Sequence, residues 1–547
     1  MKFDDFLFKN LGEIGKFQAI QLVLVCIPMF FVSSEGLSWT FASVDMRFRC
    51  KLDGEASPLK YKTDQLVFSK CAEEESKKAR NISDWGQKGV LCEYDEKCSV
   101  NGQKCSEHVY YHESDSTYMA TERWDLVCDH AWIKALVQAF YYIGQLFGSY
   151  SFGVLGDKLG RKAALYISLI LQIPFCLLVI LAPWWWLYTI SRFLIGFAHA
   201  GTYLLANVAG METVGPKYRK LAGVGIGYFS AFGQIGLGVV AYFVRDYVYL
   251  HMIFAAPTIV YVLYWWLVPE SLRWLVSKQR YQDADVVLRK AAKMNNKEIP
   301  DEWWEELDKS NSGEDVEHLT TFDLFKTPKI RRRTLIMFFV WPVITMVYYG
   351  ISMRSNILGG DIYTNFIICS AIELPAITLV ALLNDRLGRR TIVAASLFIS
   401  GLSLILNLVV DDNVGFVMAV LQMTIAKGAI TLAFATSLIY SPELYPTAVR
   451  NTATGLLATI ARIGAIFASF IAMWIADYGK IYMIIPFGIG AIIASALTII
   501  FLPETMGRPL PDTLEDVEGD ENNYMALKEA ESGSASEAES GGDEEKS

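Results

Sequence analysis

The chain has 547 residues, of which 53% are hydrophobic and only 20% are charged. Soluble domains carry about a quarter charged residues, so this balance argues against an ordinary soluble protein and favours one solvated by a lipid bilayer. The formal net charge of -9 is concentrated in the tail, because residues 512–547 hold 13 acids and 2 lysines, which leaves the remainder near +2 (-9 minus -11).

Long apolar segments recur along the whole chain. A membrane-spanning helix needs about 20 mostly apolar residues, because the hydrocarbon core is about 30 Å thick and a helix rises about 1.5 Å per residue. The first segment is not preceded by a basic region with a small-residue cleavage site, so no cleaved signal peptide is expected. Twelve segments qualify as spans, near 17–43, 133–156, 163–182, 185–212, 219–243, 249–268, 333–353, 361–383, 391–409, 414–440, 449–476 and 479–502.

Two hydrophilic insertions, 44–132 and 269–332, divide these spans into six and six. The second insertion is rich in lysine and arginine and ends in Arg331-Arg332-Arg333 against the next span. Basic loops near membrane ends stay in the cytoplasm, and with an even number of spans both termini are then cytoplasmic. The predicted organisation is a cytoplasmic N-terminus (1–16), a first bundle (17–268) with an extracellular loop (44–132), a cytoplasmic linker (269–332), a second bundle (333–502) and an acidic disordered tail (503–547).

The extracellular loop holds an even, clustered set of cysteines, which is typical of disulfides in an oxidising compartment. Their pairing stays open, since six cysteines allow 15 connectivities. A zinc site is the weaker interpretation, because the set lacks the paired CxxC spacing of structural zinc. The loop also contains the glycosylation acceptor pattern Asn81-Ile82-Ser83. The expected disulfide cysteines are Cys50, Cys71, Cys92, Cys98, Cys105 and Cys128.

A short motif occurs once in each half. GDKLGRK (156–162) lies between spans two and three, and NDRLGRR (384–390) lies between spans eight and nine. Two copies at matched positions predict an internal repeat of two six-helix units. The glycines permit a tight turn, the aspartate can meet a helix N-terminus, and the bases can bind carboxylates elsewhere.

Further strings carry a close resemblance to a known family. They are ERWDLVC (122–128), PESLRWLVSKQR (269–280), PELYPTAVRN (442–451) and LPETMGRPLPDT (502–513). With the six-cysteine loop, they make residues 1–515 similar to the organic cation, organic anion and carnitine transporters, solute carrier family 22. The resemblance implies an all-α major facilitator fold of 12 transmembrane helices in two bundles, and transport of small amphipathic ions across the plasma membrane by alternating access.

Ionisable residues inside spans are costly, and each is a functional candidate by default. Glu35, Glu373, Lys427 and Arg462 are the candidates for substrate binding, while packing or a helix-to-helix hydrogen bond is the simpler interpretation of His199. Others lie toward helix ends or in the repeated motifs, where gates or ion pairs between helices are expected. The predicted gating residues are Asp157, Arg161, Glu212, Glu270, Arg273, Asp385, Arg389, Glu443 and Arg450, with Arg192 and Arg245 as further interface candidates.

Aromatic residues recur on single helix faces. Tyr228 and Phe232 are four residues apart, while the pairs Trp341 with Tyr348 and Lys427 with Phe434 are seven apart. Such stripes also arise from packing or from a lipid-facing surface. The resemblance implies that several of these positions line a central cavity where ring faces hold ammonium groups. The predicted cavity set is Tyr203, Tyr228, Phe232, Trp341, Tyr348 and Phe434, with Tyr142 as a further candidate.

The charges give a divided prediction for the substrate. Glu373 resembles the cation-preferring members, whereas Arg462 resembles the anion and carnitine branches. Together with Glu35 and Lys427 they offer both signs, which suits a zwitterion or a compact amine, although a structural ion pair would also explain them. We therefore predict a transporter of organic cations or zwitterions, with an organic anion exchanger and a nontransporting receptor as alternatives.

Other classes are disfavoured. The sequence shows no nucleophile and base pattern, no HExxH and no phosphate loop, so neither an enzyme nor direct coupling to ATP is predicted. We expect no cofactor, metal or nucleic acid, and the expected partners are a small organic ion and the lipid bilayer. The sequence leaves oligomeric state and ion coupling open.

Overall fold

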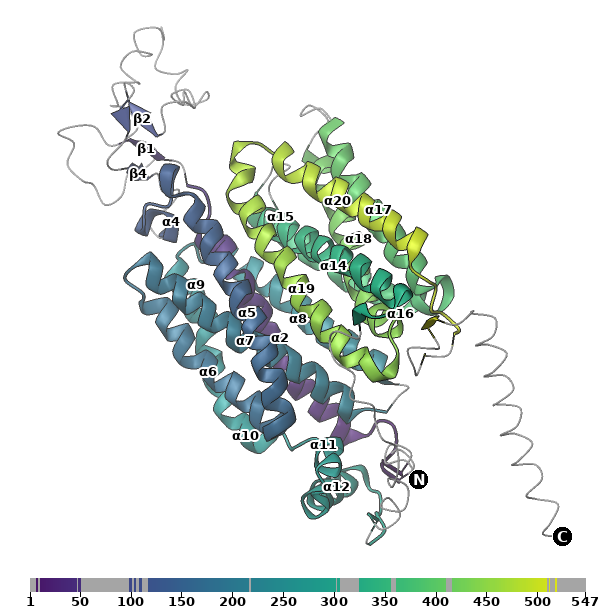
Figure 1. Cartoon of the computed structure of the whole chain (residues 1–547). Helices are drawn as coiled ribbons and strands as arrows, with labels where there is room; N and C mark the ends of the chain where they lie inside the picture. Colours follow the sequence, from purple (N-terminus) through teal and green to yellow (C-terminus); the bar gives the residue numbers. More distant parts are fainter. Residues whose placement is uncertain are drawn as a thin grey trace, which may run out of the picture.

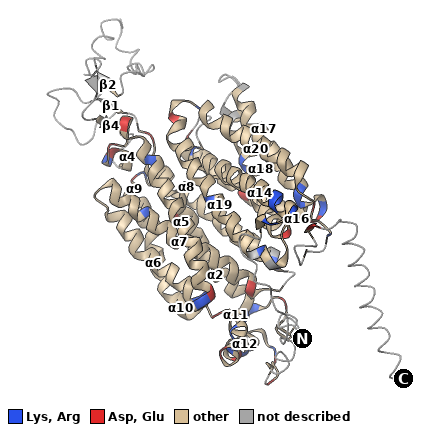
Figure 2. Ribbon diagram, viewed as in Figure 1, with Lys and Arg blue, Asp and Glu red and all other residues tan. Residues whose placement is uncertain are grey.

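The structure is a computed structural model of the chain (Figure 1). It describes residues 6–7, 10–46, 48–50, 98–100, 103–104, 108–110, 117–215, 218–301, 303–304, 324–355, 361–409, 416–508, 511 and 517–518. Two groups of long helices lie side by side, the first coloured purple to teal and the second green to yellow (Figure 1). Charged residues gather mainly toward the helix ends, and the helical segments between these ends are mostly uncharged (Figure 2).

The first half contains five long helices and one composite span. Its sixth span is an α-helix, a 3-10 segment and a last α-helical turn, because a proline near the start of the 3-10 segment lacks the N–H of a regular helix. The elements are α2 (Lys16–Ala42), α5 (Trp132–Leu159), α6 (Arg161–Leu181), α7 (Trp185–Thr213), α8 (Arg219–Phe243), α9 (Tyr247–Ala255), η6 (Ala256–Leu263) and α10 (Tyr264–Leu267).

The second half repeats this plan. Its second span is divided at Ile372, where α15 ends and α16 begins. The elements are α14 (Pro328–Met353), α15 (Ile362–Ala371), α16 (Glu373–Leu387), α17 (Arg389–Val409), α18 (Phe416–Glu443), α19 (Thr447–Met473), η9 (Ile475–Tyr478) and α20 (Ile481–Phe501).

Eleven helical segments of the described chain are long and apolar enough to cross a membrane. The helix outside this set, α5, has 28 residues but carries Lys134, Gln138 and Gln145 among its apolar positions. It still packs closely against α7, because a Cβ at Gly144 or Gly148 would overlap a backbone carbonyl of that helix.

The two halves meet mainly along five helices. Helix α5 contacts α19, and α8 contacts both α15 and α16. These contacts leave the first and second halves as separate helix groups that touch along shared edges (Figure 1). Movement of one half against the other would therefore change contacts at these helices first.

The end of the molecule with the first insertion, here called the loop end, carries short strands. Strand β1 (Phe48–Cys50) pairs antiparallel with β4 (His108–Tyr110), and β2 (Ser99–Val100) pairs with β3 (Gln103–Lys104). A disulfide joins Cys98 and Cys128. The side chain of Cys50, together with Cys71, Asn81, Cys92 and Cys105, lies outside the described residues, so those predictions stay predictions.

The segment after the strands attaches the loop to the first half. It contains α4 (Ala120–Arg123) and η4 (Cys128–His130). Trp124 donates to the carbonyl of Pro183 (3.1 Å), and Arg123 donates to the Tyr247 hydroxyl. Burial alone would raise the pKa of Asp125, but hydrogen bonds from His108 and Tyr110 hold it below its ordinary value. The ERWDLVC string is thus an anchor for the loop.

The opposite end, here called the linker end, carries α11 (Leu272–Ser277) and α12 (Tyr281–Asn295) (Figure 1). The N-terminal segment packs on these helices in a small apolar cluster that includes Phe6, Leu11 and Trp274. The Asn295 side chain accepts the Phe17 amide at 3.0 Å, which holds the start of α2 to α12. The linker helices are therefore attached to the first half.

The start of the acidic tail contacts the second half at the same end. Thr447 donates its amide to the carbonyl of Pro511 (3.1 Å). Farther along, the Glu518 carboxylate accepts the amide of Lys329 at the start of α14 (2.7 Å). The tail beyond 518 lies outside the described residues, and its predicted disorder stays a prediction.

Candidate functional site

A buried ion pair lies inside the second half. Lys427 on α18 and Glu373 on α16 approach to 2.7 Å, with side chains 1% and 3% exposed. Glu373 stands at the first position of α16, where the chain breaks from α15 and a carboxylate complements the helix dipole. Lys427 also donates to the Ser352 hydroxyl at 2.7 Å. The acid that the sequence offered for a substrate cation is therefore already paired.

Aromatic rings surround this ion pair. The Lys427 ammonium lies 3.4 Å from the ring centre of Tyr348, whose hydroxyl donates to Glu373 at 2.9 Å. The Tyr348 ring stacks on Phe434 at 5.3 Å, and Trp341 meets Phe434 edge-on at 5.6 Å. The structure thus brings together the two pairs predicted from i to i+7 spacing, Trp341 with Tyr348 and Lys427 with Phe434, around the predicted acid Glu373.

One residue of the first half reaches this group. The Gln234 amide, on α8, donates to the Tyr348 hydroxyl (3.1 Å) and to Glu373 (3.2 Å). Sequence reasoning missed Gln234, although a buried amide within an apolar span is itself a signal of a polar contact between helices. We call Gln234, Trp341, Tyr348, Glu373, Lys427 and Phe434 the central cluster.

Arg462 on α19 lies in a different electrostatic setting. Its guanidinium donates to the carbonyl of Ala458 on its own helix (2.6 Å). Its electrostatic neighbours are the side chains of Tyr349, Tyr203 and Tyr141. Within the described part of the chain, no carboxylate forms an ion pair with Arg462. Arg462 as a residue is half-buried, and its guanidinium lies among tyrosine side chains.

Tyr142 and Tyr349 link the two halves beside Arg462. Tyr142 is 1% exposed on α5, and its ring lies 4.9 Å from that of Tyr349 on α14. Tyr349 in turn packs edge-on against Tyr348 of the central cluster at 5.1 Å. Tyr349 was not among the predicted residues. The tyrosines form a connection between Arg462 and the central cluster.

Two predicted rings lie elsewhere. Phe232 is 49% exposed and shares a helix face with exposed Phe243, while Tyr228 bonds to Thr378 on an exposed face of α16 (2.5 Å). Because Gln234 is two residues from Phe232, the two side chains point about 160° apart around α8. The structure therefore does not bring Tyr228 and Phe232 to the central cluster.

Glu35 is also separate from the central cluster. It is 2% exposed within the first half, and its carboxylate lies 3.1 Å from His251 on α9. The nearby Arg192 guanidinium donates to the backbone carbonyl of Glu35 at 2.8 Å. The prediction that Glu35 faces a substrate cavity finds no support in this arrangement, because neighbouring helices cover the carboxylate.

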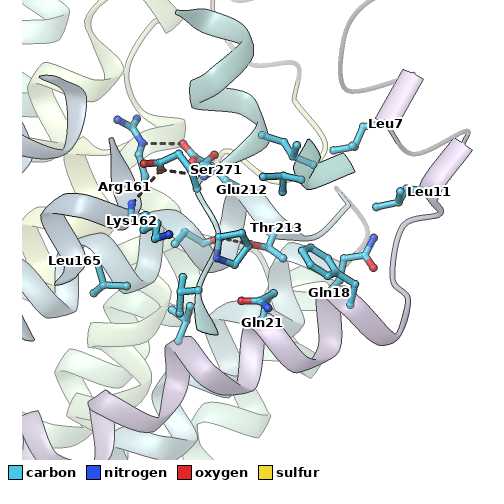
Figure 3. A pocket seen from close by; sticks show the side chains of 18 residues that line it. Leu7, Leu11, Gln18, Gln21, Arg161, Lys162, Leu165, Glu212, Thr213 and Ser271 are labelled. Carbon is cyan, nitrogen blue, oxygen red and sulfur yellow. Dashed lines mark hydrogen bonds and ion pairs between the residues drawn. The ribbon is translucent and has the colours of Figure 1, made fainter. Parts of the chain in front are cut away.

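The predicted gating residues of the first half form contacts with one another at the linker end. Arg161 contacts Asp157 at 2.8 Å and Glu212 at 3.4 Å, while Glu270 accepts the amide of Lys162 at 3.0 Å. Trp274, next to Arg273 in the PESLRW string, donates to the carbonyl of Asp157. Of these residues, Arg161, Lys162, Glu212 and Glu270 line a pocket between the N-terminal segment, α2 and the linker (Figure 3).

The second half has matching pairs. Arg389 lies 3.6 Å from Asp385 and 3.3 Å from Glu443, and Glu504 accepts the amide of Arg389 at 2.8 Å. Arg450 donates to the carbonyls of Pro442 and Tyr445. Both copies of the repeated motif thus close onto carboxylates of their own half.

At the loop end, ion pairs join the two halves. Asp45 of the first half accepts from Lys134 (2.6 Å) and lies 3.6 Å from Arg354 at the end of α14. Arg354 also binds Asp477 at 2.5 Å. Beneath these charges, Phe41 of α2 stacks on Tyr363 of α15 at 5.4 Å. We call this set the outer closure.

Comparisons with known proteins agree with this arrangement. The sequence pattern of the sugar (and other) transporter family matches residues 93–516. The "organic cation transporter protein" of Drosophila melanogaster is 34% identical, with 95% of each chain covered. The human "organic cation/carnitine transporter 2" is 31% identical over 93% of this chain and 92% of its own.

The chain belongs to solute carrier family 22. It is a membrane transporter and not an enzyme. Its fold is the major facilitator fold, as in the E. coli xylose transporter XylE in a partially occluded inward-open conformation, with a TM-score of 0.59. That match covers 90% of this chain and 100% of the xylose transporter at 15% identity. The expected family and fold are therefore confirmed.

Within this solute carrier chain, the central cluster lies in the second half except for Gln234 of the first half, and Arg462 lies beside it. A buried ion pair neutralises the charges of Glu373 and Lys427, whereas Arg462 forms no ion pair with a carboxylate of the described residues and has tyrosines as neighbours. Such a site can present ring faces to an organic ammonium and a guanidinium to a carboxylate.

Proposed function

We propose that the chain carries small zwitterions, with an ammonium group at one end and a carboxylate at the other, across the plasma membrane. The observation that carries the proposal is the half-buried Arg462, which has no carboxylate partner among the described residues. The two predicted acids are both engaged, Glu373 with Lys427 and Glu35 with His251. A lone organic cation would therefore meet no unpaired acid at this site.

The ammonium end would lie on the rings of the central cluster. The Tyr348 ring already holds the Lys427 ammonium, and the rings of Phe434 and Trp341 pack in sequence beside it. Each cation-π contact is worth about 0.5 to 2 kcal/mol. The carboxylate end would accept hydrogen bonds from Arg462, as charge-assisted bonds to a guanidinium are among the strongest in proteins.

Alternating access would move this site between the two sides of the membrane. Gln234 binds Tyr348 and Glu373 across the boundary between the halves, so a ligand at the central cluster would act on that boundary. The outer closure joins the halves at the loop end. We assign this end to the outside, with the basic linker and both termini in the cytoplasm, in agreement with the disulfide between Cys98 and Cys128.

An organic anion exchanger is the second candidate, and Arg462 is the observation that favours it. The two candidates differ in the ammonium group. An anion exchanger needs only the guanidinium, whereas a zwitterion carrier needs both Arg462 and the rings. Relatives named for organic cation and carnitine transport support the zwitterion over the anion.

The test is uptake of a matched set of labelled compounds in cells that express the full chain, compared with mock cells. The set contains a quaternary-ammonium carboxylate, its methyl ester and an aromatic carboxylate without an amine. Saturable uptake of the zwitterion above its ester supports the proposal. Uptake of the aromatic carboxylate alone would replace it with the anion exchanger, and uptake equal to mock for all three would remove both.

A further inference from the structure

The first half contains a buried ionisable network that the proposed substrate site does not use. Glu35 on α2, His251 on α9 and Arg192 on α7 are 2%, 1% and 0% exposed. All three lie within membrane spans, where unused charges are costly and rarely kept. The network therefore calls for a role besides substrate contact.

The Glu35 carboxylate and the Arg192 guanidinium do not form a direct ion pair. Arg192 donates to the backbone carbonyls of Glu35 (2.8 Å) and Gly36 (3.2 Å) and to the Gln138 amide oxygen (3.0 Å). The side-chain oxygens of Glu35 instead meet His251 (3.1 Å) and the Ser38 hydroxyl (3.2 Å). The arrangement gives Glu35 an imidazole as its acid-base partner.

His251 has partners suited to both of its protonation states. Its Nδ1 faces Glu35, and its Nε2 lies 2.9 Å from the Tyr188 hydroxyl. In neutral His251, Nδ1–H donates to Glu35 and Nε2 accepts from Tyr188. In charged His251, Nε2–H donates to the Tyr188 oxygen instead. Because a hydroxyl can donate or accept, the contact between His251 and Tyr188 is kept when His251 gains or loses a proton.

The charge of this network depends on that proton. With neutral His251, the charges of Arg192 and Glu35 cancel, and one bound proton leaves a net charge of +1 in a buried environment. The proton is therefore held better when a negative group lies near. The other titratable groups that face the network from α5, α6, α7 and α9 are Tyr141, Cys176, Tyr188, His199 and Tyr247.

Contacts lead from this network toward the substrate site. The Arg192 guanidinium lies 4.7 Å from the ring centre of Tyr141, which also neighbours Arg462. The Tyr141 hydroxyl is bonded to His199 at 3.1 Å. A carboxylate bound at Arg462 would place negative charge on this side of the network and favour the added proton.

We propose that Glu35 and His251 form a proton-binding site, and that one proton crosses the membrane with each zwitterion. This inference rests on the proposed function. A proton from outside water binds Nε2 of neutral His251, and the imidazolium is held by the Glu35 carboxylate and the Tyr188 hydroxyl. The same proton leaves to the cytoplasm after the substrate carboxylate has left Arg462. Because a zwitterion carries no net charge, each cycle moves one positive charge inward.

The experiment uses proteoliposomes that hold the purified full chain, in sodium-free buffer. An outside pH about one unit below the inside pH can drive up to about tenfold accumulation of a zwitterion carried with one proton. Exchange of labelled for unlabelled zwitterion at equal pH on both sides measures transport without net proton movement. The two readouts separate proton coupling from the proposed function.

Wild-type protein is expected to accumulate the zwitterion on the acid gradient, with an inward positive current. Glu35→Gln and His251→Gln are each expected to lose accumulation, to a ratio of about one, while they retain exchange. His199→Gln is the matched control, a buried histidine bonded to Tyr141 rather than to an acid, and should keep both activities.

Two results would overturn the proposal while the proposed function stands. One is intact exchange by the wild type without any response to the acid gradient, and the other is full accumulation by Glu35→Gln. Stimulation by an alkaline outside would likewise reject symport. Absence of zwitterion exchange by the wild type would reject the proposed function itself. The proposed proton-binding site, which rests on that function, would then be rejected too.

Discussion

The buried pair of Glu373 and Lys427 makes a quantitative prediction about stability. Glu373→Gln keeps the size of the side chain and one oxygen that can still accept from Tyr348, so the main change is the loss of the negative charge. Lys427 would then be a buried cation held only by Ser352 and a ring face. Removing one partner of a buried pair costs about 3 to 5 kcal/mol, and these remaining contacts place the loss near the lower value.

A double-mutant cycle tests this. Lys427→Met removes the cation and keeps an unbranched apolar side chain, so Glu373→Gln combined with Lys427→Met should lie within about 1 kcal/mol of the wild type. The measurement is the equilibrium stability, or the thermal midpoint, of the full chain in detergent for all four proteins. If the two single losses simply add in the double variant, the pair does not contribute to the folded protein as argued.

Three further predictions address the site and the closure. Phe434→Leu should weaken binding of ammonium substrates by about 2- to 30-fold through a lost cation-π contact, while Phe232→Leu, on the exposed face of α8, should change binding little; equal losses would contradict the assignment. Gln234→Leu should lower turnover more than affinity, because its bonds cross between the halves; an unchanged rate would refute this. Arg354→Gln removes the contacts of Arg354 with both aspartates of the outer closure, Asp45 and Asp477. A cysteine that replaces Tyr363, which belongs to the same closure, should then react faster with an impermeant maleimide. An unchanged labelling rate would count against the closure.

Much of the fold could be predicted from hydropathy, because each span must satisfy its backbone within the membrane. The predicted segments coincide with the long helices to within a few residues at most ends. The exceptions are local. The span predicted at 249–268 is part 3-10 helix, and the span at 361–383 is divided at Ile372, where Glu373 begins the second piece. Hydropathy alone does not report such breaks.

The candidate site was predicted in part. Spacing by seven placed Lys427 with Phe434 and Trp341 with Tyr348, and the structure brings these pairs into one cluster. The spacing of residues along a helix shows which of them share a face, but it does not show toward which part of the protein that face is turned. Spacing therefore could not tell that Phe232 lies on an exposed face of α8, away from the central cluster, and its place in a cavity stays a prediction.

Glu35 illustrates a second limit of the sequence. Its partner His251 is 216 residues away, and no local pattern joins them. Only the packing of α2 against α7 and α9 shows that the carboxylate is turned into the first half. The charge that remains available at the substrate site, Arg462, could be recognised only after the partners of the acids were known.

The central claim is that Arg462 binds the carboxylate of a zwitterion, and the most direct measurement is a comparison of binding to a zwitterion and to its methyl ester. Loss of one charge-assisted contact of about 1.5 to 3 kcal/mol corresponds to about 10- to 150-fold in affinity. We predict that Arg462→Gln weakens zwitterion binding by this factor and leaves ester binding unchanged, with Arg462→Lys between. Equal binding of the zwitterion by the wild type and Arg462→Gln, with both proteins folded, would contradict the account.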